Sequence, residues 1–258
     1  MCLNHIRILK IMRSDLMLNE RLILNEERNV TLDVYIPDVS PEMPNMNVKP
    51  AILVFPGGAY AFCSDREAEP VAFEFMAKGY NAFILRYSLN ENALFPNPLN
   101  DAIQALKLIR ENCEKWHTDP HKIAVCGFSA GGHLAAAVST MSEEKPDACI
   151  LGYPCILSKI GKVLAQPVPS LESLVTSETP PTFIASASDD DIVPIEHSLK
   201  YASALTEYNV PYEMHIFSRG GHGFSTSTEV VTVEERREFV KNTVTWIPMC
   251  IEWLKTIF

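Results

Sequence analysis

The sequence of 258 residues predicts an α/β fold, in which a mostly parallel, twisted sheet has helices on both faces and an antiparallel hairpin at its N-terminal edge. Two observations lead to this prediction. Short, nearly continuous apolar segments alternate with segments of helical periodicity, as expected for strands that are covered on both faces. Ahead of them, the strand-like segments RLILNEE and VTLDVYIP are separated only by Arg28 and Asn29.

The strands expected after the hairpin share a short, apolar composition: AILVFP (51–56), YNAFILRY (80–87), KIAVCG (122–127), ACILGYP (148–154), TFIASAS (182–188) and YEMHIF (212–217). The helices expected between them place their apolar residues on one face: PVAFEFMAKG (70–79), NDAIQALKLIRENCEKW (100–116), LAAAVSTM (134–141) and PIEHSLKYASALTEY (194–208). In sheets of this kind, ligands bind at the carboxyl ends of the strands. The functional residues are therefore expected in the loops that follow the strands.

We expect a single domain over residues 20–258 and an N-terminal extension over residues 1–19. The apolar start, MCLNHIRILKIMRSDL, is interrupted by charged side chains before the core of a signal peptide can form. It is interpreted as an extension or upstream start, with a lost or poorly recognised export signal as the alternative. Residues 155–181 contain four prolines and no strong period, and two interpretations stay open: a small cap over the strand ends or an ordinary surface connection.

Composition excludes several classes of function. A net charge of −10 argues against a broad basic surface for nucleic acid or for an anionic membrane. We find no apolar segment of 18 residues that could span a membrane. The seven cysteines include no C-x-x-C pair and are interpreted as reduced core thiols, which favours a cytoplasmic location. Neither an H-E-x-x-H pattern nor zinc-like Cys/His spacing occurs, so no metal or cofactor is expected.

The segment CGFSAGGH (126–133) contains the strongest candidate for a nucleophile. Ser129 follows an expected strand and precedes an expected helix, and the flanking glycines at 127 and 131 remove side chains that would collide in so sharp a turn. The helix that begins after the serine also directs backbone N–H groups toward developing negative charge. This context predicts an activated serine.

A serine hydroxyl needs a base, and histidine is the usual one near neutral pH. His222 lies in the glycine-rich loop RGGHGFS after the last expected strand, where its side chain can project over the strand ends. His133 lies one turn into the helix after Ser129 and is expected to support that turn. Structural roles are assigned to four other histidines: His117, His121, His197 and His215.

The base in turn needs a carboxylate that fixes its tautomer and stabilises its charged form. The segment TFIASASDDDIVP offers Asp189, Asp190 and Asp191 directly after a strand. All three satisfy the chain order serine, acid, histidine. Local physics does not separate them.

Together, FPGGAY, GFSAGGH, DDDIVP and GGHGF resemble the α/β-hydrolase superfamily over roughly residues 20–258. Within it, the chain is most similar to small acetyl-ester hydrolases related to acetylxylan esterases and to hormone-sensitive-lipase-like carboxylesterases. This resemblance implies Asp190 as the acid, four places before a proline. It also implies that the N–H groups of Gly58, Ala59 and Ala130 form an oxyanion hole. Pro56 stands where the lipase-like branch has histidine.

The resemblance implies a serine esterase that hydrolyses short-chain acyl esters through Ser129, His222 and Asp190. Its partner would be a small-molecule or oligosaccharide ester, with O-acetyl groups on carbohydrates as the expected substrate. Tyr60 and Phe128 are candidates for narrowing the acyl side of the site. Two alternatives are kept: a serine aminopeptidase of the prolyl-oligopeptidase type, and a non-catalytic binding module with a hydrolase-like fold.

Overall fold

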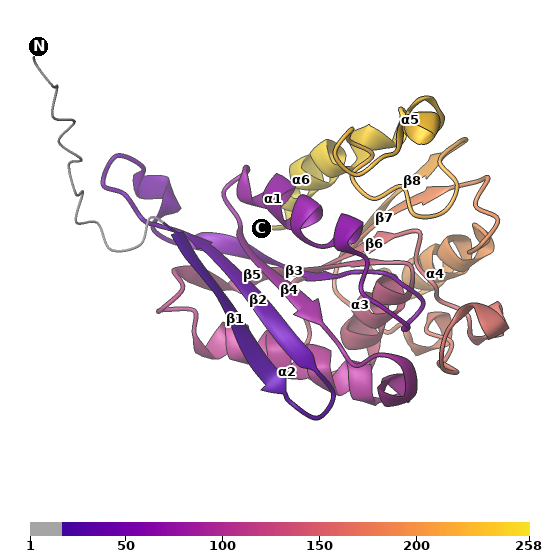
Figure 1. Cartoon of the computed structure of the whole chain (residues 1–258), viewed down its shortest axis with the longest axis horizontal. Helices are drawn as coiled ribbons and strands as arrows, with labels where there is room; N and C mark the ends of the chain where they lie inside the picture. Colours follow the sequence, from indigo (N-terminus) through magenta and orange to yellow (C-terminus); the bar gives the residue numbers. More distant parts are fainter. Residues whose placement is uncertain (1–16) are drawn as a thin grey trace, which may run out of the picture.

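In the computed structural model, which describes residues 17–258, an eight-stranded sheet runs through the molecule (Figure 1). Its strands along the chain are β1 (Met17–Asn25), β2 (Val30–Pro37), β3 (Lys49–Phe55), β4 (Asn81–Arg86), β5 (Thr118–Phe128), β6 (Ala148–Gly152), β7 (Thr182–Ala187) and β8 (Tyr212–Phe217). Across the sheet the order is β1-β2-β4-β3-β5-β6-β7-β8. The pairs β1–β2 and β2–β4 are antiparallel, and all others are parallel. The predicted fold class is confirmed.

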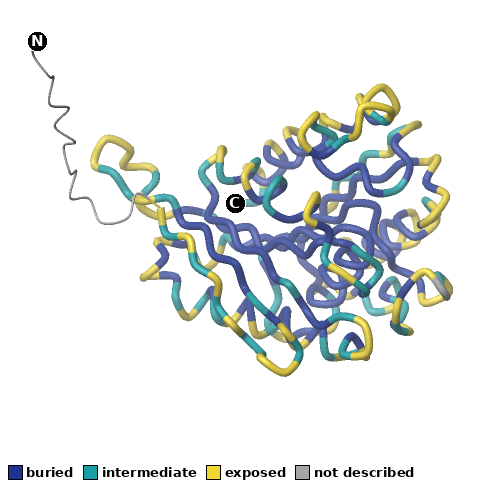
Figure 2. The backbone as a smooth tube through the Cα atoms, in the orientation of Figure 1, coloured by how far each residue is buried: buried dark blue, intermediate teal, exposed yellow. Residues whose placement is uncertain are grey.

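Helices cover both faces of this sheet. They are α1 (Glu69–Met76), α2 (Asn97–Glu111), α3 (Ala130–Met141), α4 (Glu196–Glu207), α5 (Glu234–Val240) and α6 (Trp246–Ile257). Successive residues of β3 separate the two cores: Leu53 and Phe55 pack with α2, α3 and α4, whereas Ile52 and Val54 pack with α1 and α6. Strands β2 to β7 are largely buried between these layers, whereas the edge strands β1 and β8 are partly exposed (Figure 2). None of the helices in residues 17–258 is long and apolar enough to cross a membrane.

Several of the observed elements differ from those predicted from sequence. β1 begins at Met17, ahead of the expected domain start at residue 20, because its even-numbered side chains continue to face the core beyond that point. Residues 1–16 lie outside the described residues. Helix α2 begins at Asn97, where Pro98 occupies a first-turn position that tolerates proline. Helix α6 was not predicted, although its buried residues lie at helical spacing.

Within residues 17–258, the connections contain six short 3-10 helices: η1 (Pro44–Met46), η2 (Asp65–Glu67), η3 (Asn90–Ala93), η4 (Ser158–Val163), η5 (Glu172–Leu174) and η6 (Thr243–Thr245). Two of them, η4 and η5, lie within residues 155–181. In this segment, the side chains of Leu164 and Leu171 pack in the core on the α3 side of the sheet. The N–H of Ala165 donates to the carbonyl of Ala59, 2.8 Å away. The segment therefore lies against the loop that follows β3.

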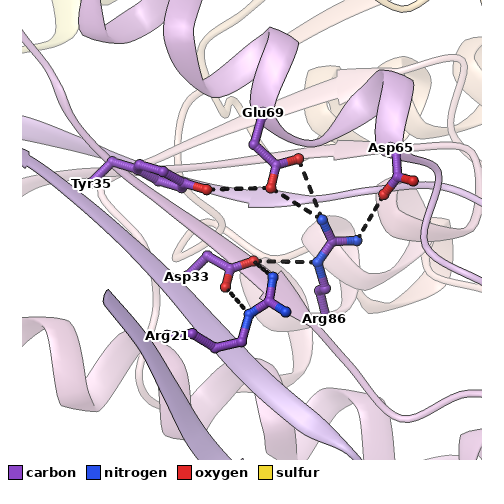
Figure 3. Close-up of polar contacts among 6 residues, drawn as sticks. All are labelled: Arg21, Asp33, Tyr35, Asp65, Glu69 and Arg86. Atoms are coloured by element: carbon purple, nitrogen blue, oxygen red, sulfur yellow. Dashed lines mark hydrogen bonds and ion pairs between the residues drawn. The ribbon is translucent and has the colours of Figure 1, made fainter. Parts of the chain in front are cut away.

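An ion-pair cluster fixes the short helix η2 beside strand β4 (Figure 3). The guanidinium of Arg86 contacts Asp65 at 3.1 Å, Glu69 at 3.2 Å and Asp33 at 3.3 Å. Arg21 of the edge strand binds the same Asp33 carboxylate. Because Asp65 and Glu69 flank residues 66 and 67, the cluster holds these two residues in place next to the loop after β3.

Candidate active site

Ser129 lies at the sharp turn between β5 and α3, at the carboxyl end of the central strand. Its backbone has φ 52° and ψ −116°, a conformation that is strained for a residue with a side chain. Two hydrogen bonds of 3.0 Å hold this turn: the N–H of Ser129 donates to the carbonyl of Gly152, and the N–H of Cys155 donates to the carbonyl of Ser129. The backbone of the neighbouring strand β6 and its following loop thus fixes the serine.

The glycines on either side of the serine are required by close backbone contacts. A Cβ on Gly127 would lie 2.0 Å from the carbonyl oxygen of Gly131. One on Gly131 would lie 2.0 Å from the carbonyl oxygen of Phe55, at the end of β3. Both distances are far below van der Waals contact, and the obstacles are backbone atoms. The turn can form only without side chains at these positions.

His222 lies in the loop after β8, and its imidazole connects the serine with an aspartate. Its Nε2 atom lies 2.8 Å from Oγ of Ser129, and its Nδ1 atom lies 2.8 Å from Oδ2 of Asp190. The three side chains come from three separate loops that follow β5, β7 and β8. An Nδ1–H that donates to the carboxylate leaves Nε2 free to accept the serine proton.

The structure separates the three aspartates that local sequence could not distinguish. Asp190 is buried, and its Oδ1 accepts hydrogen bonds from the N–H groups of Ile192 at 3.0 Å and Val193 at 2.9 Å. Asp189 is exposed and accepts a hydrogen bond of 2.9 Å from the N–H of Gly221 in the histidine loop. Asp191 is exposed. Only Asp190 reaches the imidazole.

The loop after β3 presents backbone N–H groups beside the serine. Gly58 has φ 128° and Ala59 has φ 58°, so the chain turns sharply here. Among the residues described by the structure, neither of their N–H groups donates to another protein group. The N–H of Ala130 is the first of helix α3 and belongs to a helix end that lacks intrahelical acceptors. The arrangement supplies donors of the kind that stabilise an oxyanion.

Glu67 is a buried carboxylate at this site that the sequence analysis did not single out. Its Oε2 accepts a hydrogen bond of 2.8 Å from the N–H of Gly57, and its Oε1 accepts one of 2.7 Å from the hydroxyl of Tyr153. The ring of Tyr153 packs edge-on at 5.1 Å from that of His222. Burial raises the pKa of Glu67, and these hydrogen bonds oppose that effect. In DREAEP, no local feature separates this acid from its neighbours.

A cavity of about 190 Å³ opens at Ser129 and His222. Its apolar wall is formed by three side chains that were not predicted as substrate-binding residues: Phe62, Val163 and Ile192. The expectation that Tyr60 and Phe128 contact substrate is corrected. Both side chains are buried in the core, because the Tyr60 hydroxyl bonds to His133 and the Phe128 ring packs on Tyr153 and Trp246.

Two further buried histidines hold the segment 155–181 against the site. His133 lies with Nε2 3.0 Å from the carbonyl oxygen of Pro169, and burial lowers its pKa to about 4. His197 accepts hydrogen bonds at Nδ1 from the N–H groups of Ile156 and Leu157, at 2.9 and 3.1 Å. Burial lowers its pKa as well. Both rings have structural contacts, as the sequence analysis assigned.

The sheet order and the strand–serine–helix turn define the class of α/β hydrolases. A solved structure, MGS-M1, an α/β hydrolase enzyme from a deep-sea metagenome library, is 41% identical and superposes with a TM-score of 0.88 over 95% of this chain and 99% of its own. The chain belongs to the α/β-hydrolase superfamily and is similar to its esterases. Family models of BD-FAE and of the prolyl oligopeptidase family match residues 32–153 and 164–245.

Curated relatives match most of the chain. An endo-1,4-β-xylanase B from Butyrivibrio fibrisolvens is 33% identical over 226 residues, which are 76% of this chain and 36% of that protein. An acetylxylan esterase from Xylanibacter ruminicola is 32% identical over 202 residues, which are 69% of this chain and 42% of that protein. The chain therefore spans about two fifths of the length of these relatives.

Proposed function

We propose that this protein is a serine esterase that removes short acyl groups from carbohydrate esters, with Ser129 as nucleophile, His222 as base and Asp190 as the residue that orients the base. The observation that carries the proposal is the pair of 2.8 Å hydrogen bonds that joins these three side chains. In this arrangement the imidazole takes the hydroxyl proton as Oγ attacks the ester carbonyl. The buried carboxylate of Asp190 stabilises the imidazolium that results.

The tetrahedral intermediate places negative charge on the former carbonyl oxygen. The N–H groups of Gly58, Ala59 and Ala130 are the donors proposed for this oxygen. Collapse of the intermediate needs a proton on the leaving alcohol, and the imidazolium of His222 supplies it. The acyl group then remains on Ser129 until a water, deprotonated by the same imidazole, completes hydrolysis.

The acetyl group is favoured over longer acyl groups by the size of the cavity. Its volume of about 190 Å³ is below the range of roughly 300–1,000 Å³ that is typical of sites for drug-sized ligands. An O-acetyl group on a carbohydrate combines a small acyl part with a polar alcohol. Similarity to an acetylxylan esterase supports the same substrate class.

A second candidate is a serine aminopeptidase, since residues 164–245 match the prolyl oligopeptidase family. This candidate shares the nucleophile, acid and base but acts on an amide. It is less favoured because the peptidase family model matches residues 164–245, which do not include Ser129, whereas the acetylxylan esterase is similar over 202 residues. Hydrolysis of aminoacyl p-nitroanilides with negligible ester cleavage would favour it.

The test of the proposal is covalent labelling together with a Ser129→Ala variant. A fluorophosphonate probe should label the wild-type protein at Ser129, and the variant should remain folded and lose at least about a thousandfold in turnover of p-nitrophenyl acetate. Circular dichroism checks the fold of the variant. Near-normal turnover in a folded variant, or labelling at another residue, would contradict the assignment.

A further inference from the structure

A second cavity adjoins the one at Ser129. It has a volume of about 230 Å³ and shares Arg66 and Gly223 with the first cavity. Arg236 of helix α5 also lines it, and among residues 17–258 no acidic residue does. Two cationic side chains thus line a cavity next to the proposed active site. The chain as a whole has a net charge of −10.

Both guanidiniums donate hydrogen bonds to the histidine loop, and each has further N–H groups that are not used in these bonds. Nη1 of Arg66 donates to the carbonyl of Gly223 at 3.1 Å, and Nη2 of Arg236 donates to the carbonyls of Gly220 and His222, each at 3.2 Å. A guanidinium has five N–H donors. The Nε groups of both arginines, with Nη2 of Arg66 and Nη1 of Arg236, donate to no other group among residues 17–258.

Neither arginine has a carboxylate partner within 4.0 Å in the described part of the chain. Two of the acids near Arg66 in sequence, Asp65 and Glu69, contact Arg86 instead (Figure 3). The charge of Arg66 acts to lower the pKa of the Glu67 carboxylate. The two oxygens of this carboxylate, however, accept hydrogen bonds from the N–H of Gly57 and the hydroxyl of Tyr153. The positive charge in the second cavity is therefore available to a ligand.

The reaction geometry determines which part of a substrate would enter this cavity. The imidazole of His222 protonates the leaving oxygen, so the alcohol part of the ester must lie against this ring. Gly223, the next residue, is shared by both cavities. The alcohol part of a bound ester is thereby directed toward the two arginines.

We propose that the second cavity binds a carboxylate on the alcohol part of the substrate, which makes this protein selective for acyl esters of acidic sugars. The proposal rests on the esterase function proposed above. The planar fork of a guanidinium matches a carboxylate in two parallel hydrogen bonds, and two such groups, both hydrogen-bonded to the histidine loop, orient the alcohol relative to His222. A neutral alcohol of the same size lacks these contacts.

The test compares two acetate esters that differ in one charge, those of 4-hydroxybenzoate and of 4-hydroxybenzamide. For each enzyme, the measured quantity is the ratio of kcat/KM for the charged ester to kcat/KM for the neutral one. Arg66→Gln and Arg236→Gln should each lower this ratio by about tenfold, the low end of what a hydrogen bond to a charged group contributes. Because the ratio is internal to each variant, a general loss of activity cancels.

Arg237→Gln is the matched control, because it removes the same charge from the same helix at an exposed position. It should keep the wild-type ratio. High salt should lower the wild-type ratio toward that of the two glutamine variants, since it screens an open ion pair. If the ratio is the same in wild type, Arg66→Gln and Arg236→Gln, the proposed carboxylate site is rejected, but the proposed esterase function is not. If folded wild type hydrolyses neither ester, the esterase proposal itself fails.

Discussion

The hydroxyl of Tyr60 lies 3.0 Å from Nδ1 of His133. The opposite ring nitrogen, Nε2, lies 3.0 Å from the carbonyl oxygen of Pro169, which can only accept a hydrogen bond. Nε2 therefore carries the proton, and Tyr60 donates to Nδ1. A single neutral imidazole on helix α3 thus joins the loop after β3 to the segment 155–181, and both contribute residues to the cavity at Ser129.

This relationship predicts a loss of stability in acid. Burial lowers the pKa of His133 to about 4, so between pH 6.5 and pH 4 the unfolded chain binds a proton that the folded protein does not. The stability contributed by this group is full above pH 6.5 and is lost as the pH falls, by about 3 kcal/mol at pH 4. Urea unfolding of wild type and His133→Gln at a series of pH values would measure it.

The variant should unfold more easily at pH 7 and show a shallower loss toward pH 4. It will not remove the acid dependence entirely, because burial also lowers the pKa of His197. His121→Gln is the control, since that side chain is exposed and should keep the wild-type dependence. An identical slope in His133→Gln and wild type would show that His133 is not responsible.

Gly131→Ala should prevent the serine turn from forming. The added methyl group would meet the carbonyl oxygen of Phe55 at 2.0 Å, and neither strand nor helix can move without breaking its hydrogen bonds. We expect a destabilisation of several kcal/mol, about 3 or more, with loss of fluorophosphonate labelling. Gly161→Ala has open space around it and should cost only about 1 kcal/mol for its positive φ. Equal melting temperatures for the two variants would contradict this explanation.

Asp190→Asn should lower turnover by about three orders of magnitude, because an amide no longer selects the tautomer in which Nε2 of His222 can accept a proton. Asp191→Asn should have almost no effect, since that side chain is exposed. An intermediate loss is expected for Asp189→Asn, whose carboxylate holds the N–H of Gly221. Steady-state kinetics on one ester, with thermal melts for each variant, would separate these outcomes. An inactive Asp191→Asn would shift the assignment by one residue.

Much of the sheet could be predicted from sequence, because each buried strand is a short apolar segment and the parallel strands follow one another along the chain. The candidate triad could be predicted as well, since Ser129, the aspartates and His222 each follow a strand end in the expected order. Local pattern could not choose among Asp189, Asp190 and Asp191. That choice depends on the N–H groups of the loop after β7, which turn only one carboxylate inward. The catalytic roles of Ser129, Asp190 and His222 stay predictions.

Other parts of the site depend on tertiary contacts that sequence patterns do not report. Glu67 has two acidic neighbours of similar local character, and only the fold buries it against Gly57 and Tyr153. Tyr60 and Phe128 are adjacent to functional backbone, but their side chains point away from the cavity into the core. Sequence proximity to a catalytic residue indicates where the backbone lies and leaves the side-chain direction open.

The acyl-chain preference is the prediction that most directly tests the shape of the site. The cavity at Ser129 is about 190 Å³, and part of that space must admit the attacking water and the leaving oxygen. Burying one more methylene gains up to about 0.8 kcal/mol where there is room. Against the wall formed by Phe62, Val163 and Ile192, a long chain must instead displace side chains or leave the cavity.

Catalytic efficiency on p-nitrophenyl esters should therefore be highest for acetate, lower for butyrate and very small for octanoate, and acetylated xylo-oligosaccharides should release acetate. Replacing a wall residue, as in Val163→Ala, should relax the preference by raising kcat/KM for butyrate relative to acetate, because it adds space without touching the proposed triad. Met141→Ala, at an exposed residue far along helix α3, should keep the wild-type profile. A wild-type profile that rises toward octanoate would contradict the proposed preference for short acyl groups.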